Sequence, residues 1–504
     1  MNKDDYLILF FPDTNEGLDR INPPLNLLAI ASVLEREGIA FQIVDGRIEK
    51  DHKQKILNMI DNGAKAIGMG VQTGPQIGFA LKVCKTIKDK KPDFPVIWGG
   101  WHGSIMPEQT VSYPCVDYVA IGQGENTMLE LWNCLMNNGD ISSVNGIAYK
   151  RDGVPVLNAP RELVSLEEFP PLPFHLIDLS KYPGRKTGPN RVFATYRTSQ
   201  GCPWRCGYCA DPLVFQRRWK GLGPVRIVDE LQYIHEKYGV NEVLFVDDTF
   251  IVSPKRVRDM CEEMMKRNLR IEWQACARTG MIAKMEQEDL NLMAAAGCVL
   301  IHPGVEAPSQ EMLDHIYKDE KNENTYICAE KLAKAGIRGL YSFMVFYPNE
   351  PKDLIQKTFQ TIARLKKIDP NNVCPVNFFV PFPGNPLFEE AVEKGLKRPE
   401  SLEDWSFFNT RSGDATPWVK PKDKDFILKM DKYYLPAAFP SKSLKMKISH
   451  GKFRLVYLFF HKMAKFRVNS ENFKSCWDWK LLYAYWKFWE RFNRKYPLHN
   501  IHFR

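Results

Sequence analysis

The segment SQGCPWRCGYCADP, residues 199–212, is the most informative stretch of this sequence. It places Cys202, Cys206 and Cys209 in a CxxxCxxC array. Three thiolates this close in sequence can bind three corners of a cubane iron–sulfur cluster, whereas ferredoxins and structural zinc sites use four ligands. No fourth cysteine lies nearby, so one iron would stay open to a substrate. The alternatives are three free thiols on a surface loop, or a zinc site that a distant histidine completes.

This spacing, together with Gly201, Pro203 and Tyr208, resembles the signature loop of the radical S-adenosylmethionine (SAM) enzymes. The resemblance implies a 4Fe-4S cluster on the three cysteines, with SAM bound at the open iron. It also implies that an electron from the reduced cluster cleaves SAM to give a 5'-deoxyadenosyl radical. An external electron donor of flavodoxin or ferredoxin type is therefore an expected partner.

The composition is that of an ordinary globular protein with an uneven charge distribution. A chain of 504 residues can form two or three domains with full hydrophobic cores. The net charge is +9, but residues 441–504 alone hold fifteen Lys and Arg against three Asp and Glu, so the rest of the chain is mildly acidic. This distribution disfavours nucleic acid as a partner.

Cysteine usage and hydropathy indicate the compartment. The other nine of the twelve cysteines are scattered through apolar stretches, and we expect free, buried thiols rather than disulfides. The first residues lack the zones of a signal peptide, and no run of about eighteen apolar residues occurs. The sequence therefore predicts a cytoplasmic protein in a reducing environment.

Residues 1–150 alternate strand-like and helix-like segments. The pattern predicts a Rossmann-like, doubly wound parallel sheet, and such sheets bind ligands beyond the carboxyl ends of their strands. The expected strands lie at 6–11, 41–45, 66–71, 95–100 and 118–122.

The loops at those strand ends are rich in glycine and proline, so a bulky planar ligand can approach the backbone closely. Ahead of the cluster loop, they resemble the cobalamin (B12)-binding domain of cobalamin-dependent radical SAM enzymes, a class that includes the anaerobic magnesium-protoporphyrin ester cyclase and many methyltransferases. The DxHxxG motif, whose histidine binds cobalt, is absent, so His102 is not assigned as a cobalt ligand. The alternative is a domain of this fold without a cofactor. The residues expected to contact cobalamin are Asn22, Pro23, Thr73, Gly74, Gln76, Gly99, Gly100, Trp101, His102, Gly122, Gly124 and Glu125.

Residues 151–190 are rich in proline and turn residues and are expected to link two domains. In residues 191–400, strand-like runs alternate with helical segments, which predicts a partial (β/α)6 barrel whose site lies at the carboxyl ends of its strands. The cluster loop follows the first of these strands, as such a site requires. The expected strands are 192–198, 242–248, 271–277, 299–306, 340–346 and 375–381, and the expected helices lie near 225–238, 254–268, 286–296, 309–335 and 351–367.

Other strand ends of this barrel match positions of the radical SAM family. The resemblance places Asp247 and Asp248 at the SAM amino group and Arg278 at the SAM carboxylate. It places Glu306 at the ribose hydroxyls and Tyr208 at the adenine. For Arg278 and Glu306 the alternative is a surface ion pair at the barrel rim.

One segment departs from the family pattern. The glycine-rich turn expected after the fifth barrel strand is replaced by Phe-Tyr-Pro-Asn-Glu at 346–350. These bulky residues leave contacts between this turn and SAM unassigned.

Residues 401–504 are predicted to be mainly helical. Sixteen aromatic residues accompany the basic residues of 441–504. An amphipathic basic-aromatic helix can lie peripherally in a membrane interface, here the inner membrane face, or it can pack against the barrel with its cations extended to water. Both interpretations stay open.

The predicted function is that of a cobalamin-dependent radical SAM methyltransferase acting on an unactivated carbon of a hydrophobic small molecule, such as a lipid or a tetrapyrrole. The resemblance implies that the 5'-deoxyadenosyl radical removes a substrate hydrogen and that methylcobalamin donates the methyl group. One alternative is a radical cyclase or oxidoreductase on a tetrapyrrole or lipid. An alternative of another class is a cobalamin-binding or electron-transfer module without SAM turnover.

Overall fold

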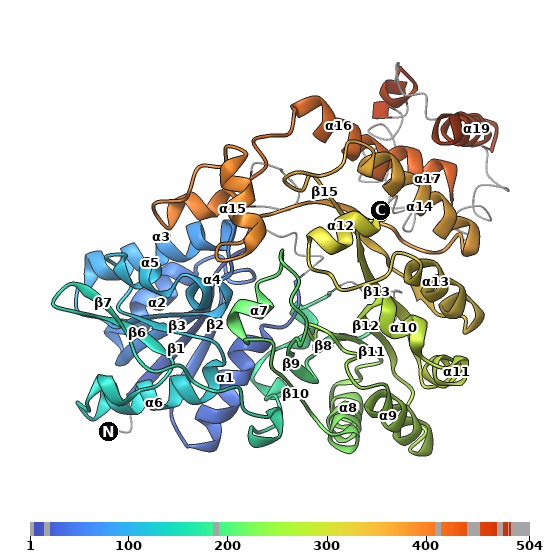
Figure 1. The fold of residues 1–504 in the computed structure, drawn as a ribbon. Helices are drawn as coiled ribbons and strands as arrows, with labels where there is room; N and C mark the ends of the chain where they lie inside the picture. The colour runs from blue at the N-terminus through green and yellow to red at the C-terminus, as the bar shows by residue number, and fades with distance from the viewer. Residues whose placement is uncertain are drawn as a thin grey trace.

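The computed structural model describes residues 5–14, 21–184, 191–408, 415–440, 454–470, 477–481 and 483–484. In these residues the chain forms two largely parallel sheets that lie side by side, each covered by helices (Figure 1). A mainly helical C-terminal region contacts both units. The predicted succession of a Rossmann-like sheet, a partial barrel and a helical region is confirmed.

The first sheet has the strand order β2-β1-β3-β4-β5-β6-β7, and its first five strands are parallel. All five predicted strands are present within a few residues of the expected bounds. They are β1 (Tyr6–Phe11), β2 (Phe41–Asp45), β3 (Ala64–Gly70), β4 (Val96–Gly99) and β5 (Tyr118–Ala120). The helices are α1 (Leu25–Arg36), α2 (His52–Asp61), α3 (Pro75–Lys90), α4 (Gly100–Ile105), α5 (Pro107–Ser112) and α6 (Gly124–Met136).

Strand β1 shows why this sheet is covered on both faces. Leu7 and Leu9 belong to a core formed with α1 and α6, whereas Ile8 and Phe10 belong to a second core formed with α2, α3 and α5. Because successive side chains of a strand point to opposite faces, a continuous apolar run needs helices on both sides.

The sheet continues past residue 150 in an antiparallel hairpin that the sequence interpretation missed. Strand β6 (Ile147–Arg151) pairs with β5 and with β7 (Val154–Leu157). Asp152 and Gly153 form the turn, and both have positive φ, 51° and 80°. Positive φ at both central residues is the geometry of a tight hairpin turn.

The second sheet has the order β16-β15-β13-β12-β11-β8, and all of its strands are parallel. The six predicted strands are present, and neighbours in sequence are neighbours in the sheet, which forms an open half-barrel. The strands are β8 (Phe193–Tyr196), β11 (Glu242–Phe245), β12 (Glu272–Arg278), β13 (Cys298–Glu306), β15 (Ser342–Val345) and β16 (Val376–Phe378), with the two-residue β14 (Arg338–Gly339) beside β13. The helices are α8 (Pro224–Tyr238), α9 (Pro254–Lys266), α10 (Thr279–Lys284), α11 (Gln287–Ala295), α12 (Gln310–His315), α13 (Asn324–Lys334) and α14 (Leu354–Ile368).

One predicted helix of this unit is divided. The expected helix at 309–335 is the pair α12 and α13, and the chain between them leaves the helical path. Tyr317 and Asp319 have φ values of 52° and 51°, which an α-helix cannot contain. This break carries a residue of the candidate site.

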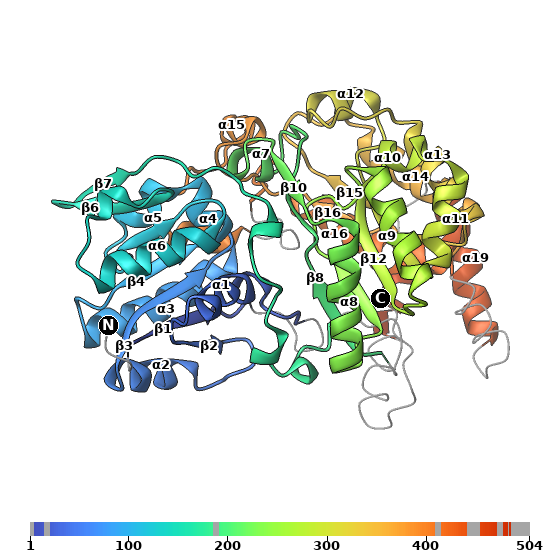
Figure 2. The same ribbon diagram turned by 90° about the horizontal axis from the view of Figure 1, so that it is seen from below.

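The segment that links the two units has little regular structure beyond short 3-10 turns such as η3 (Leu166–Glu168), and it runs along the junction between them (Figure 2). After the half-barrel, α15 (Pro386–Glu393) and η6 (Glu403–Phe407) return to the first unit, where Leu402, Trp405 and Phe408 join the core of α2, α3 and α5. The C-terminal region therefore fastens the first unit to the second.

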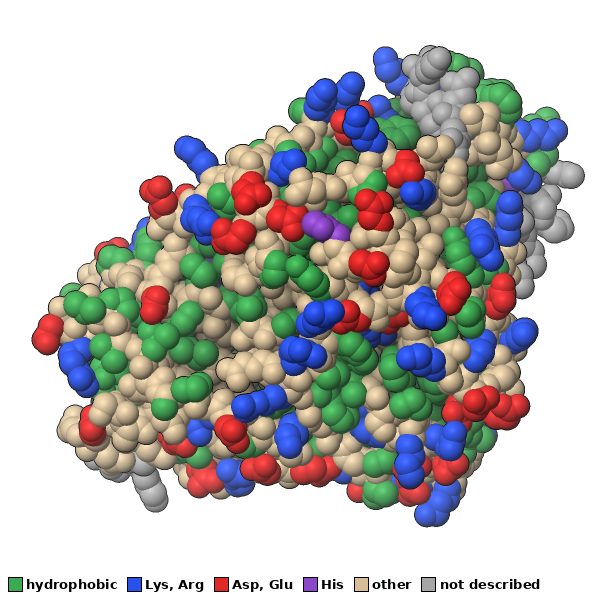
Figure 3. Space-filling model, viewed as in Figure 1, with side chains coloured by type: hydrophobic (Ala, Val, Ile, Leu, Met, Phe, Trp, Pro, Cys, Tyr) green, Lys and Arg blue, Asp and Glu red, His purple; other side chains and the backbone are tan. Residues whose placement is uncertain are grey.

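The rest of the described C-terminal region packs on the half-barrel. It comprises α16 (Pro421–Lys429), the π-helical turn η7 (Met430–Tyr434), α17 (Leu435–Ala438) and α19 (Arg454–Ser470). Residues 441–453, 471–476, 482 and 485–504, which hold much of the basic-aromatic segment, lie outside the described residues. None of the described helices is both long and apolar enough to span a bilayer. On the face drawn in Figure 3, positive and negative side chains are interspersed over both units.

Candidate active site

The cluster loop lies between two short antiparallel strands. Strand β9 (Ser199–Gly201) pairs with β10 (Trp219–Gly221), and the loop between them holds the three cysteines and α7 (Asp211–Val214). Gly201 has a φ of 82°, and a Cβ atom there would lie 2.3 Å from the carbonyl oxygen of Arg218. Only glycine fits this position, so the base of the loop is fixed by its backbone.

The three thiols have the character of cluster ligands. Cys206 is buried, and Cys202 and Cys209 are half-buried. Burial raises the pKa of Cys202 to about 12 and raises the pKa of Cys209. The guanidinium of Arg278 donates to the Cys206 sulfur at 3.3 Å. Because iron replaces the thiol protons and supplies positive charge, these residues fit a cluster held by three thiolates.

The described residues contain no group of three or more His, Cys, Asp or Glu side chains arranged around a single metal ion. The thiolates of a cubane bind different irons, so they do not need to converge on one point.

Asp247 and Asp248, predicted to contact SAM, hold the base of the cluster loop. Buried Asp247 accepts hydrogen bonds from the hydroxyls of Thr198, at 2.8 Å, and Ser199. Asp248 accepts from the backbone N–H of Gly201 at 2.9 Å. Burial of its carboxylate raises the pKa of Asp248 to about 6, although the residue as a whole keeps exposed surface. Asp248 thus keeps surface free for a ligand, and the SAM contacts of both residues stay a prediction.

Arg278 has protein partners on every side. It forms an ion pair of 2.9 Å with Glu320, and both side chains are under 10% exposed. It also donates to the Lys318 carbonyl oxygen and lies over the Trp204 ring, 4.6 Å from the ring centre. The structure therefore places Arg278 beside the cluster loop, and its predicted pairing with the SAM carboxylate requires that it share or exchange these partners.

Lys318 is a further candidate for the site, which the sequence interpretation missed. Its ammonium group donates to Glu306 Oε1 and to the Tyr208 hydroxyl, each at 3.0 Å, and the residue is only 5% exposed. Glu306 has a φ of 63°, a strained conformation for a residue other than glycine. The structure thus brings together the two residues predicted for adenosine and joins them through a buried cation. Lys318 lies in a charged run, KDEK, that is typical of a solvated turn, so its burial was not predictable from the sequence.

The bulky turn after β15 is closed by its own carboxylate. Phe346 has a φ of 71°, the conformation that glycine usually supplies. Glu350 Oε2 accepts from the backbone N–H groups of Phe346 and Tyr347 at 2.5 and 3.0 Å. These N–H groups are therefore satisfied within the turn.

Glu350 should make stability depend on pH. Burial raises its pKa from 4.5 to about 7, so between these pH values the folded protein binds more protons than the unfolded chain. The contribution of this group is full below pH 4.5 and is lost as the pH rises to 7, by at most about 3 kcal/mol. We expect wild type to lose stability relative to Glu350→Gln over this range in urea unfolding. The control variant Glu262→Gln, at an exposed residue, should show the same dependence of stability on pH as wild type. If the stability of Glu350→Gln runs parallel to that of wild type over this range, the assignment is wrong.

The loops predicted to bind cobalamin lie together at the carboxyl ends of the first sheet. Gly100 has a φ of 84°, and a Cβ there would lie 2.9 Å from the backbone nitrogen of Val71. A Cβ at Gly122, whose φ is 76°, would meet no atom within 4 Å. Gly122 therefore leaves open space for a ligand. At Gly100, by contrast, the absence of a side chain lets the backbone pack closely against Val71.

Two of these loop residues carry unsatisfied polar atoms. Asn22 Oδ1 and His102 Nε2 are both buried without a hydrogen-bond partner. His102 Nδ1 lies 3.0 Å from the Thr73 hydroxyl, its ring packs edge-on against Trp405, and burial lowers its pKa to about 4. Buried polar atoms without partners are rare, and unmatched groups in a ligand loop fit a ligand rich in polar groups, such as a corrin with its amide side chains.

Other residues of this set have partners within the protein. Gln76 accepts from the backbone N–H of Gln72 at 2.8 Å, and a Cβ at Gly74 would lie 2.7 Å from the carbonyl oxygen of Phe408. Glu125 is paired with Arg197 of the second unit. The role of each residue toward cobalamin stays a prediction.

The two sets of loops face each other. Trp101, in the first turn of α4, packs edge-on against Phe215 of the cluster loop with ring centres 5.7 Å apart. Helix α4 also contacts α7. The candidate cobalamin and cluster sites therefore share one interface.

Comparison with protein families agrees with this division. The B12 binding domain matches residues 18–132, and the radical SAM superfamily matches residues 196–362. These ranges lie within the first unit and within the half-barrel up to α14, respectively. Both predicted domain types, and with them the predicted cofactor classes, are confirmed.

Curated relatives cover most of the chain. An uncharacterized methyltransferase of Pyrococcus horikoshii is 29% identical over 399 residues, which is 77% of this chain and 84% of that protein. The anaerobic magnesium-protoporphyrin IX monomethyl ester cyclase of Rubrivivax gelatinosus is 27% identical over 357 residues, which is 70% of this chain and 61% of that protein.

Solved structures share the fold. The radical S-adenosylmethionine methyltransferase TsrM of Kitasatospora setae, determined with cobalamin and a [4Fe-4S] cluster, gives a TM-score of 0.64 at 20% identity, covering 78% of this chain and 76% of its own. The cobalamin-dependent radical enzyme OxsB, determined with aqua-cobalamin, gives 0.68 at 18% identity, covering 92% of this chain and 80% of its own.

Proposed function

Because the chain belongs to the radical SAM enzymes that carry a B12-binding domain, we propose that it is a methyltransferase acting on an unactivated carbon of a hydrophobic small molecule. The observation that carries this proposal is the shared interface of the two loop sets, where Trp101 meets Phe215. A methyl donor on one domain and a radical source on the other can act on one substrate only if both open onto the same space.

The residues of the site have distinct tasks in this proposal. When bound, the cluster and SAM supply the radical, and cobalamin supplies the methyl group. Cys202, Cys206 and Cys209 hold the cluster, and Arg278 places positive charge beside it. Glu306, Tyr208 and Lys318 form the pocket for the adenosine part of SAM, with Glu306 held as an acceptor for hydroxyl groups. The electron comes from an external donor of flavodoxin or ferredoxin type.

Products formed under anaerobic conditions test the proposal. Reconstituted protein should hold about four irons per chain together with one corrinoid. With SAM and dithionite it should release both 5'-deoxyadenosine and S-adenosylhomocysteine. A protein that binds the corrinoid and releases neither product would be a binding or electron-transfer module instead.

A second candidate is a radical cyclase or oxidoreductase on a tetrapyrrole or lipid. It is favoured by the similarity to the Rubrivivax gelatinosus cyclase over 70% of this chain. A cyclase needs no methyl donor, so 5'-deoxyadenosine without S-adenosylhomocysteine would select this candidate.

Peripheral membrane contact would suit a hydrophobic substrate, and the described part of α19 supports it. Leu455, Phe459 and Phe466 lie on one face of this helix and are 81%, 49% and 62% exposed. The exposed Lys462 and Lys465 lie between them. Exposed aromatic residues beside lysines are typical of helices that bind anionic lipid surfaces.

Phe459→Ser combined with Phe466→Ser should lower partition into phosphatidylserine-containing vesicles by at least about tenfold, because two apolar anchors are lost. Co-sedimentation with the vesicles measures this change. Phe407→Ser is the matched control, since Phe407 is 67% exposed but lies on η6. Equal partition of the double variant and wild type would exclude α19 as the contact.

A further inference from the structure

The two units meet through buried amide groups beside both candidate cofactor sites. Gln123, 5% exposed, lies between Gly122 and Gly124 in the loop after β5. Its Nε2 donates to Gln200 Oε1 at 3.0 Å. Gln200, 8% exposed, belongs to β9 and precedes Cys202 by two residues. This hydrogen bond joins the cobalamin loop directly to the base of the cluster loop.

The linking segment holds the same glutamine from its other side. Val164 N–H donates to Gln123 Oε1 at 3.1 Å, and Gln123 Nε2 also donates to the Val164 carbonyl oxygen at 3.3 Å. With these bonds both polar atoms of the Gln123 side chain are occupied. Its rotamer is therefore fixed by two separate parts of the chain, strand β9 and the linking segment.

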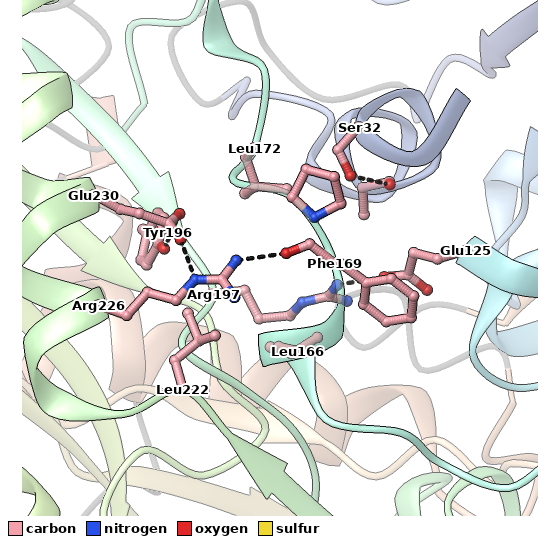
Figure 4. Close-up of a pocket in the computed structure, with 12 residues that line it drawn as sticks. Ser32, Glu125, Leu166, Phe169, Leu172, Tyr196, Arg197, Leu222, Arg226 and Glu230 are labelled. Carbon is pink, nitrogen blue, oxygen red and sulfur yellow. Dashed lines mark hydrogen bonds and ion pairs between the residues drawn. The ribbon is translucent and has the colours of Figure 1, made fainter. Parts of the chain in front are cut away.

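An ion pair crosses the same junction. Arg197 Nη2 lies 2.9 Å from Glu125 Oε1, and the Glu125 carboxylate is 4% exposed. Figure 4 shows Arg197 extending across the junction toward Glu125, while Arg226 bonds Glu230 and the carbonyl oxygen of Phe169. Loss of Arg197 would leave a buried carboxylate without a counter-charge, which proteins tolerate poorly.

The junction is closely filled. The cavity drawn in Figure 4 has a volume of about 30 Å³, enough for a water molecule. On the barrel side, Thr198, Ser199 and Gly201 are bonded to Asp247 and Asp248, so the cluster loop keeps its own anchors when Arg197 or Gln200 is changed.

We infer that Gln123 and Glu125, with Gln200 and Arg197, are positioning residues that fix the separation between the cobalamin loops and the cluster loop. This inference rests on the proposed function. With both cofactors bound, SAM would serve two sites: besides being cleaved at the cluster, it would give its methyl group to the reduced corrinoid, with S-adenosylhomocysteine as the leaving group. Misplacement by about 1 Å can lower such a transfer about 100-fold.

Holoenzyme variants separate the two uses of SAM. Gln200→Leu combined with Arg197→Met should lower S-adenosylhomocysteine formation by about 10- to 100-fold, with dithionite or titanium(III) citrate as reductant. Formation of 5'-deoxyadenosine and bound corrinoid should stay within about twofold of wild type, because the residues that hold each cofactor are unchanged. The single variant Arg197→Lys keeps the positive charge opposite Glu125, so it should form S-adenosylhomocysteine at close to the wild-type rate.

Hydrogen exchange on cofactor-free protein gives an independent measurement. Residues 122–126 and 197–201 should exchange at least about tenfold faster in the double variant, while β12 stays as in wild type. Arg36→Met is the matched control, because Arg36 donates to the Glu168 carbonyl oxygen at 3.2 Å and thus also joins the first unit to the linking segment. It should change neither the products nor the exchange of these two segments.

Unchanged S-adenosylhomocysteine formation and unchanged exchange in the double variant would overturn the inference. A parallel loss of both products and of corrinoid would also overturn it, since these residues would then hold the cofactors themselves. A wild-type protein that does not cleave SAM would contradict the proposed function instead, and the exchange result would still decide whether the junction is held as inferred.

Discussion

Replacing Cys202, Cys206 and Cys209 together with alanine should remove the iron and lower 5'-deoxyadenosine formation by at least about 10³-fold, or about 4 kcal/mol of activation free energy. Without the three thiolates no cluster can deliver an electron to SAM. Iron content, visible absorption and chromatographic assay of the nucleoside measure the outcome. The fold should persist, because the loop is anchored by the β9–β10 pairing and by Asp247 and Asp248 rather than by its cysteines.

Cys134→Ala is the control for this experiment, since Cys134 is also a partly exposed free thiol but lies on α6 in the other unit. It should keep full iron content and full nucleoside formation. Turnover that survives in the triple variant, or zinc bound in place of iron in wild type, would refute the assignment of the loop.

Trp405→Ala should lower the free energy of unfolding by about 3–5 kcal/mol. Trp405 is 1% exposed and packs against His102, Phe388 and Phe408, and its indole N–H donates to Gln109 at 2.7 Å. Truncation leaves a large cavity and removes the hydrogen-bond donor of the half-buried Gln109 amide oxygen. Thermal unfolding followed by circular dichroism should show a lower first transition, because the first unit loses part of its core.

Phe407→Ala tests whether this effect is specific. Phe407 lies on the same 3-10 helix as Trp405 but is 67% exposed, so its truncation should change stability by less than about 0.5 kcal/mol. A loss of similar size in both variants would show that the helix, and not the buried indole, is responsible.

The strands were predictable because each carries a short apolar run between turn residues, as β1 and β13 do. The β6–β7 hairpin was missed because its outer strand is partly exposed, although Asp152-Gly153 is a usable turn signal. The cluster loop was recognisable from its cysteine spacing together with Gly201, Pro203 and Tyr208. Lys318 and Gln200 were not, because burial of a polar residue depends on distant parts of the chain that meet only in the folded protein.

The return of Trp405 to the first unit has a consequence for synthesis on the ribosome. When residue 160 has been made, every strand of the first sheet has been synthesised. The apolar surface of α2 and α3 that Leu402, Trp405 and Phe408 later cover is then still exposed. The nascent chain must carry that uncovered surface while about 240 further residues are added, roughly 12 to 50 seconds at ordinary elongation rates. Chaperone dependence of expression, and poor solubility of the isolated N-terminal half, follow from this order of synthesis.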